Sequence, residues 1–273
     1  GAGLTDNAGQ TFIGFKSGNA LVTGAEKNTL IGHNTGLKLG HADCDNNTTL
    51  GYNAMGGGHG TVGNNTANNN VAIGEDALGG STSNNFTANH NVAIGVQALT
   101  NMHGGYNNTA IGSYDQEPAA TTALNNTMIG KNAGSNQQTG QYNTYIGSVA
   151  GPSDGTLHGS STWCTGNYNT SVGGGSLKAI RSTAKGNTAI GYNAGTNAGD
   201  TNYGTYIGYD TRTTGTLDNC RDGQVKIGAF GGFQGYSNKL TMSDFTTVAD
   251  NDVASTRALI KLPRYGFLKR ITC

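Results

Sequence analysis

The sequence has few of the residues from which ordinary hydrophobic cores are built. Leu, Ile, Val and Phe together account for 46 of its 273 residues, and Trp occurs once. So few large apolar residues would fit a disordered chain, but disorder of this kind also needs a high net charge, and 16 basic residues here balance 16 acidic ones. The scarce isoleucines recur at regular intervals, which indicates an ordered repeat structure.

Other absences exclude several functional classes. With a pI near 7.2, the chain has no net charge to attract nucleic acid or an anionic membrane. It has no run of 18 apolar residues, so no membrane insertion is expected. Its four cysteines are too scattered for a disulfide framework or a C-x-x-C zinc site, and structural or free thiols are expected at Cys44, Cys164, Cys220 and Cys273, the last also able to cross-link chains.

A short motif recurs along most of the chain. It reads Asn-Thr/Val-x-Ile-Gly in copies such as Asn70-Val-Ala-Ile-Gly74 and Asn187-Thr-Ala-Ile-Gly191. The spacing between successive motif glycines varies from 17 to 26 residues, as expected if loops of variable length join constant segments. These glycines, the predicted repeat turns, are Gly14, Gly32, Gly51, Gly74, Gly95, Gly112, Gly130, Gly147, Gly173, Gly191, Gly208 and Gly228.

The motif predicts a parallel β-solenoid of about 12 degenerate coils over residues 1–235. Thr/Val-x-Ile alternates with period two, as a short strand does, and the glycine allows a sharp turn or a close backbone approach. A small residue usually follows three places later, where a larger one would clash inside the corner. Asn before each strand can bond to turn backbone or form ladders with the Asn above and below.

The third strand residue is expected to form the core, with one side chain stacked above the next. The predicted core residues are Ile13, Ile31, Leu50, Ile73, Ile94, Ile111, Ile129, Ile146, Val172, Ile190, Ile207 and Ile227. The middle strand residue would then face a symmetry axis or a neighbouring subunit, and it is large in Phe12, Leu30, Met128, Tyr145 and Tyr206. An antiparallel sandwich is the alternative, but it would need Asn-Gly or Asp-Gly turns between paired strands.

The units Asn70–Leu78, Asn91–Leu99 and Asn187–Gly195 resemble two related families. One is the head repeat of trimeric autotransporter adhesins, and the other is the N-T-A-I-G-Y-x-A-G array of phage tail-fibre and virion-appendage proteins. The resemblance covers about residues 10–230 and implies a left-handed β-roll, a homotrimer and a role in surface attachment. The coils here are longer than adhesin coils, and the chain contains no coiled-coil stalk or membrane anchor, so the phage group fits better.

Residues 236–273 depart from the repeat and are expected to form a C-terminal cap. Residues 236–242 look like a closing strand, and residues 251–262 are compatible with a helix that ends before Pro263. From Arg257 onward the chain has five basic residues and no acidic one, and they form either an assembly tail or a solvated end: Arg257, Lys261, Arg264, Lys269 and Arg270.

No catalytic residue, metal site or cofactor is predicted. The six histidines lack metal-ligand spacing, Cys164 and His158 have no third group to orient them, and no phosphate-binding loop occurs. The pairs Asp43/Asp45 and Asp250/Asp252 could hold calcium, although turn roles suit them better.

The predicted function is a structural and adhesive appendage protein on a virion or other extracellular surface. It would be a homotrimer that contacts other structural proteins and a host glycan or protein, and its receptor-binding residues are not identifiable from the sequence. The alternatives are a bacterial trimeric adhesin head, an ice-binding solenoid with aligned threonines and a glycan-cleaving fibre enzyme, which would need paired carboxylates.

Overall fold

The computed structural model describes residues 8–37, 39–56, 65–79, 86–100, 102–113, 122–153, 164–181, 183–196, 198–211, 225–227 and 239–240. The chain divides into two compact units, Gly1–Lys239 and Leu240–Cys273, where 1–235 and 236–273 were expected. The predicted helix at 251–262 and all five residues of the predicted basic tail lie outside the described residues.

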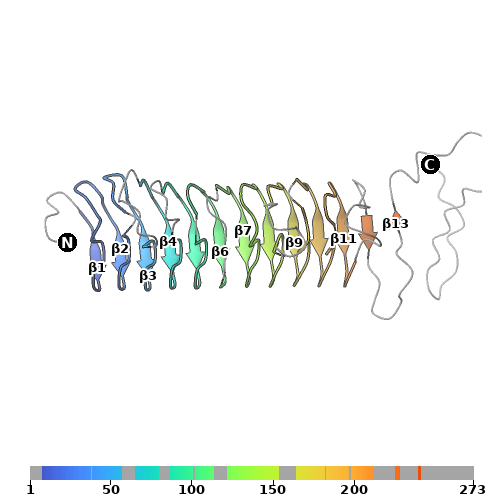
Figure 1. The fold of residues 1–273 in the computed structure, drawn as a ribbon, viewed down its shortest axis with the longest axis horizontal. Helices are drawn as coiled ribbons and strands as arrows, with labels where there is room; N and C mark the ends of the chain where they lie inside the picture. The colour runs from blue at the N-terminus through green and yellow to red at the C-terminus, as the bar shows by residue number, and fades with distance from the viewer. Residues whose placement is uncertain are drawn as a thin grey trace, which may run out of the picture. The chain divides into compact units, whose positions relative to one another are not determined.

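The first unit is an all-β parallel solenoid, as predicted. One three-residue strand per repeat joins a single sheet in which strands follow each other in chain order (Figure 1). These strands are β1 (Thr11–Ile13), β2 (Thr29–Ile31), β3 (Thr48–Leu50), β4 (Val71–Ile73), β5 (Val92–Ile94), β6 (Thr109–Ile111), β7 (Thr127–Ile129), β8 (Thr144–Ile146), β9 (Thr170–Val172), β10 (Thr188–Ile190), β11 (Thr205–Ile207) and β12 (Val225–Ile227). A two-residue strand, β13 (Lys239–Leu240), lies inside the predicted closing strand. The number of turns differs slightly from the roughly 12 coils expected.

Each strand pairs in parallel with the equivalent residues of the next. Thr29 lies beside Thr48, and Ile73 lies beside Ile94, so the third strand residues stack in one row. Every pairing of consecutive strands from β1 to β12 is parallel. The antiparallel sandwich is therefore excluded for this sheet.

The prediction that the isoleucine row forms the core is wrong. The third strand residues are half-buried or exposed, with 57% of Ile13 and 45% of Ile190 accessible to solvent. The middle residue points inward instead, and Leu30, Ala72, Tyr145 and their equivalents are buried. Alternation divides a strand into two faces, and hydrophobicity alone chose the wrong one, because the inward position holds residues from Ala to Tyr and therefore has no uniform hydrophobic pattern. The correction applies to Ile13, Ile31, Leu50, Ile73, Ile94, Ile111, Ile129, Ile146, Val172, Ile190 and Ile207; the side chain of Ile227 lies outside the described residues.

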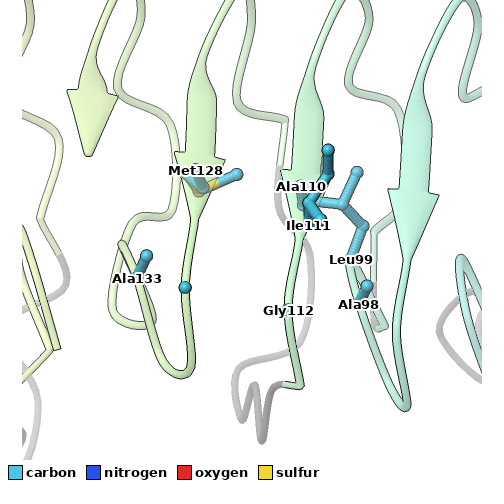
Figure 2. A pocket seen from close by; sticks show the side chains of 8 residues that line it. Ala98, Leu99, Ala110, Ile111, Gly112, Met128 and Ala133 are labelled. Carbon is cyan, nitrogen blue, oxygen red and sulfur yellow. The ribbon is translucent and has the colours of Figure 1, made fainter. Parts of the chain in front are cut away.

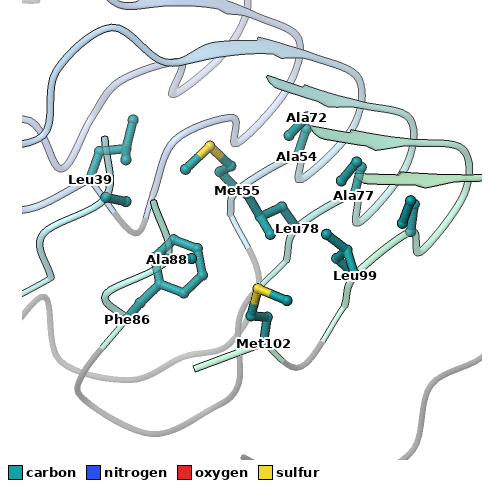
Figure 3. Packing of buried hydrophobic residues seen from close by; sticks show 14 of the residues in the cluster. Leu39, Ala54, Met55, Ala72, Ala77, Leu78, Phe86, Ala88, Leu99 and Met102 are labelled. Carbon is teal, nitrogen blue, oxygen red and sulfur yellow. The ribbon is translucent and has the colours of Figure 1, made fainter. Parts of the chain in front are cut away.

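Inside the coil, two positions share one space. Where the middle strand residue is small, as in Ala72 and Ala93, the fourth residue after the repeat glycine is large, Leu78 and Leu99. Figure 3 shows this packing between neighbouring coils. Where the middle residue is large, the fourth residue is glycine: a Cβ on Gly36 would lie 2.7 Å from the Leu30 side chain. Most described coils thus fill their interior with one large side chain from one of two places. The coil of β10 has Ala189 and Gly195 there, and the side chains of Leu177 and Tyr206 from the neighbouring coils reach that space.

The repeat glycines are needed for both reasons suggested by the sequence. Gly173 has a φ of 130°, and a Cβ there would lie 2.4 Å from the carbonyl oxygen of Gly191 in the next coil. The other described repeat glycines share this left-handed conformation, from Gly14 to Gly208. Gly228 lies outside the described residues. The residue three places after the described repeat glycines is small and buried, such as Ala54, Ala77 and Ala194, except after Gly112, where that residue lies outside the described part of the chain.

Candidate interaction surface

A ladder of buried asparagines fixes the position of every strand. The side-chain nitrogen of Asn91 donates to Oδ1 of Asn70 at 3.2 Å and to the carbonyl of Gly105 at 2.9 Å. Oδ1 of Asn91 in turn accepts bonds from the backbone and side-chain nitrogens of Asn108. We call the residues that share this pattern the ladder asparagines: Asn28, Asn47, Asn70, Asn91, Asn108, Asn126, Asn143, Asn169 and Asn187.

The carbonyl that receives each ladder bond always belongs to the residue three places before the next ladder position. Asn47 donates to Ala67, and Asn169 donates to Ala184. This residue is small and buried throughout. Its recurrence three places before each ladder position is visible in the sequence but did not enter the predictions above. At the ends of the described ladder, Oε1 of Gln10 accepts from the Asn28 backbone, and Gly204 donates to Asn187.

The sheet presents an uncharged surface, which we call the strand face. It consists of the first and third residues of β1–β11, which are only Thr, Val, Ile and Leu. Eleven strands spaced about 4.8 Å apart and about 10 Å long give roughly 500 Å². That size is at the upper end for apolar patches on monomeric proteins, where such patches are often functional.

Two lines of exposed residues border the strand face. The leading ridge comprises the residues just before each ladder position: Gly9, Lys27, Asn46, Asn69, His90, Asn107, Asn125, Tyr142, Tyr168, Gly186 and Tyr203. The trailing ridge comprises the residues just after each repeat glycine: Phe15, His33, Tyr52, Glu75, Val96, Ser113, Lys131, Ser148, Gly174, Tyr192 and Tyr209. Neighbouring rings on each ridge are stacked. Tyr142 and Tyr168 have centroids 5.3 Å apart, and Tyr192 and Tyr209 have centroids 5.4 Å apart.

Every residue of the leading ridge has a positive φ, between 55° and 73°. Asparagine and glycine tolerate this conformation, whereas a tyrosine in it costs about 1–2 kcal/mol. Tyr142, Tyr168 and Tyr203 occupy it nonetheless, and each is at least half exposed. The turn of every coil requires this conformation, and at these three positions it is occupied by a residue type that does not favour it.

The long variable segments of the chain enter the solenoid at equivalent places. Residues 57–64, 80–85 and 154–163 are followed by the described residues Asn65, Phe86 and Cys164, each five places before a ladder asparagine. Residues 114–121 are followed by Thr122, four places before one. Three of these four segments therefore rejoin the described coil at the same position, five residues before a ladder asparagine.

The buried thiols and the buried phenol contribute no reactive site. Cys44 and Cys164 are unpaired, and their Sγ atoms contact the carbonyls of Asn65 and Ile180. Burial raises the pKa of the Cys164 thiol to about 12 and also raises the pKa of Cys44, so neither is a nucleophile at neutral pH. Burial likewise raises the pKa of Tyr145, whose hydroxyl bonds to Gln137. Cys220 and Cys273 lie outside the described residues.

The described part of the solenoid offers no enclosed ligand site. The cavity between Leu99, Ala110, Met128 and Ala133 has a volume of about 20 Å³, enough for a water molecule (Figure 2). Among the described residues, no cluster of three His, Cys, Asp or Glu side chains could hold a metal ion. His41 contacts Asp43 at 3.5 Å. His158, Asp250 and Asp252 are outside the described residues. Within the same described ranges, no helix is long and apolar enough to cross a bilayer.

Comparison with known proteins gave no match, whether with family models, with curated protein sequences or with solved structures.

Proposed function

We propose that this chain is a structural and adhesive appendage protein, a phage or virus fibre, whose copies associate through the strand face. The observation that carries the proposal is the outward row of isoleucines. An exposed, uncharged, apolar surface along the solenoid is costly unless another surface covers it. Solvated protein surfaces usually carry charged side chains, and the strand face of β1–β11 has none.

A second copy of the chain is the partner that fits this face. Its rows of Thr and Ile repeat at the strand spacing, so a parallel copy presents the same rows at the same intervals. About 500 Å² from the strand face, together with the bordering ridges, approaches the roughly 800 Å² per partner of a stable interface. Three faces only one short strand wide can cover each other around one axis, which favours a homotrimer.

The variable segments support the adhesive part of the proposal. In repeat solenoids, insertions that gather at one position of the coil often form the binding face. Here three of the four segments rejoin the coil at the same position, and none interrupts a strand. They would contact a host glycan or protein, while other virion or surface proteins would bind the ends of the assembly.

Binding and association can be tested separately. The wild-type protein should bind a glycan array or a panel of bacterial cells, and a variant with residues 80–85 and 154–163 replaced by Gly-Ser segments of equal length should bind less. Both proteins should show the same mass by light scattering. If the wild-type protein binds no surface, the adhesive role is wrong and a spacer role remains.

One observation favours a second function, ice binding. Thr11, Thr29 and Thr48 and the equivalents in most other strands point outward in register beside the isoleucine row. Such an array could order water if it faced solvent. A thermal-hysteresis measurement distinguishes ice binding from association. Hysteresis at micromolar protein would support ice binding by the strand face, and its absence would leave association between copies as the role of this face.

A further inference from the structure

Two pairs of tyrosines stack on the surface of the solenoid. Tyr142 and Tyr168 are neighbours on the leading ridge, and their rings are 5.3 Å apart between centroids and 1° from parallel. Tyr192 and Tyr209 are neighbours on the trailing ridge, and their rings are 5.4 Å apart and 21° from parallel. All four residues are more than half exposed, so a reagent in solution can reach both members of each pair.

Backbone hydrogen bonds hold both pairs in register. The nitrogen of Tyr168 donates to the carbonyl of Gln141, the residue before Tyr142, at 3.0 Å. On the trailing ridge, the nitrogen of Asp210, which follows one ring of the pair, donates to the carbonyl of Tyr192 at 2.8 Å. The exposed rings can tilt about their side-chain bonds, but neither pair can separate unless the coils separate.

The described chain also has exposed tyrosines that stack on no second tyrosine: Tyr52, Tyr106 and Tyr203. Tyr52 stacks on His33 instead. The coil of Gly186 lies between Tyr203 and Tyr168 on the leading ridge. The bridge partners of Tyr106 in the adjacent coils are an asparagine and a leucine. Exposure is therefore common among these tyrosines, whereas pairing of two phenols is confined to two places.

We propose that the two stacked pairs are sites of oxidative modification, at which hydrogen peroxide and a haem peroxidase join the two phenols into dityrosine. Each phenol gives one electron to the peroxidase and its hydroxyl proton to water, which leaves a phenoxyl radical with unpaired density on the ring carbons beside the oxygen. Two neighbouring radicals form a carbon–carbon bond at these positions. Each bonded carbon then loses its hydrogen as a proton, the phenoxyl oxygen regains one, and the peroxide is reduced to water.

The product is a covalent bond between neighbouring coils. It joins residues 142 and 168, which are 26 positions apart, and residues 192 and 209, which are 17 apart. A bond that closes such a segment restricts the unfolded chain, as a disulfide does, and reducing agents do not cleave this one. Oxidation would thus stabilise the solenoid. This inference depends neither on association of copies nor on receptor binding.

Mild oxidation of the wild-type chain by hydrogen peroxide and a haem peroxidase tests the proposal. The product should show the blue fluorescence of dityrosine, migrate as a single chain on a denaturing gel and weigh two hydrogen atoms less for each cross-link. Mass spectrometry of its peptides should find Tyr142 joined to Tyr168, and Tyr192 joined to Tyr209. It should also melt at a temperature several degrees higher than before oxidation.

Phenylalanine variants separate pairing from exposure. Tyr142→Phe keeps a ring in the stack but has no phenol, so it should lose about half of the fluorescence, and Tyr142→Phe/Tyr192→Phe should lose almost all of it. The matched control Tyr203→Phe removes an exposed, unpaired phenol on the same ridge and should change the yield little. Equal losses from Tyr142→Phe and Tyr203→Phe, or a wild-type chain that forms no cross-link within one chain, would overturn the proposal and leave the proposed function unaffected.

Discussion

The side-chain nitrogen of Asn70 donates to Oδ1 of Asn47 over 3.0 Å, although 23 residues separate them along the chain. Asn108 and Asn91 form the same bond at 3.0 Å with a separation of 17 residues. The bond is thus independent of loop length. The ladder sets the register of the coils, and the variable segments between ladder positions do not disturb it.

Removal of one ladder side chain should be strongly destabilising. Asn91→Ala leaves the backbone N–H of Asn108 without its acceptor and removes one bond each from the Gly105 carbonyl, the Asn108 side chain and the Asn70 side chain. At about 1–3 kcal/mol for the unsatisfied N–H and about 1 kcal/mol for each further bond lost, we expect a loss of about 4 kcal/mol in unfolding free energy, measured by urea titration. The control Asn107→Ala, an exposed neighbour, should cost no more than about 1 kcal/mol. Equal losses in the two variants would mean that the ladder has no special role.

Two adjacent glycines should respond differently to alanine. Gly173→Ala places a methyl group 2.4 Å from the Gly191 carbonyl oxygen in a left-handed backbone, so it should cost more than about 4 kcal/mol or prevent folding. Gly174→Ala meets no atom closer than 3.4 Å and should change stability by less than about 1 kcal/mol. Thermal unfolding followed by circular dichroism compares them, and similar melting temperatures would contradict the proposed close approach of the coils.

The shared interior space predicts a compensating pair. Ala72→Leu adds a second large side chain beside Leu78 and should cost about 1–3 kcal/mol. Adding Leu78→Gly reproduces the Leu30/Gly36 arrangement of another coil and should recover most of that loss in urea titrations. A double variant less stable than Ala72→Leu alone would show that the two positions do not share one space.

The Cys164 thiol should make stability fall at high pH. Its pKa is about 12 in the folded chain against 9.0 for the free group, because burial disfavours the thiolate. Its contribution is fully present below pH 9 and is lost as the pH rises towards 12, with a slope of about 1.4 kcal/mol per pH unit. Cys164→Ser does not titrate there and should show a shallower decline in urea midpoints between pH 9 and 12. Parallel curves for the two proteins would contradict this assignment.

The sequence was sufficient to predict the fold but not the direction of its faces. Period-two alternation and the recurrent glycines predicted strands, coils and close backbone approach, and the Asn before each strand suggested a ladder. The alternation in Thr109–Ile111 is the same whichever face is inside, and the choice depends on how much room the coil leaves. The covariation of Ala72 with Leu78 and of Leu30 with Gly36 contained that information, because only inward positions need to share a volume.

The ridges were harder to recognise. Tyr142 and Tyr168 look unrelated in a linear sequence, and their stacking is seen only after the strands fix which residues lie in neighbouring coils. Nothing in the sequence shows that Tyr142 adopts a left-handed backbone conformation either, since tyrosine seldom does so.

Association of copies through the strand face is the central claim, and sedimentation equilibrium tests it directly. The wild-type chain should sediment at three times its monomer mass of 27.9 kDa. The double variant Ile111→Glu/Ile190→Glu, which places charges on two exposed positions of the face, should sediment as a monomer with its β-type circular dichroism unchanged. A wild-type chain that sediments as a monomer, or a double variant that associates as strongly as the wild type, would contradict the account.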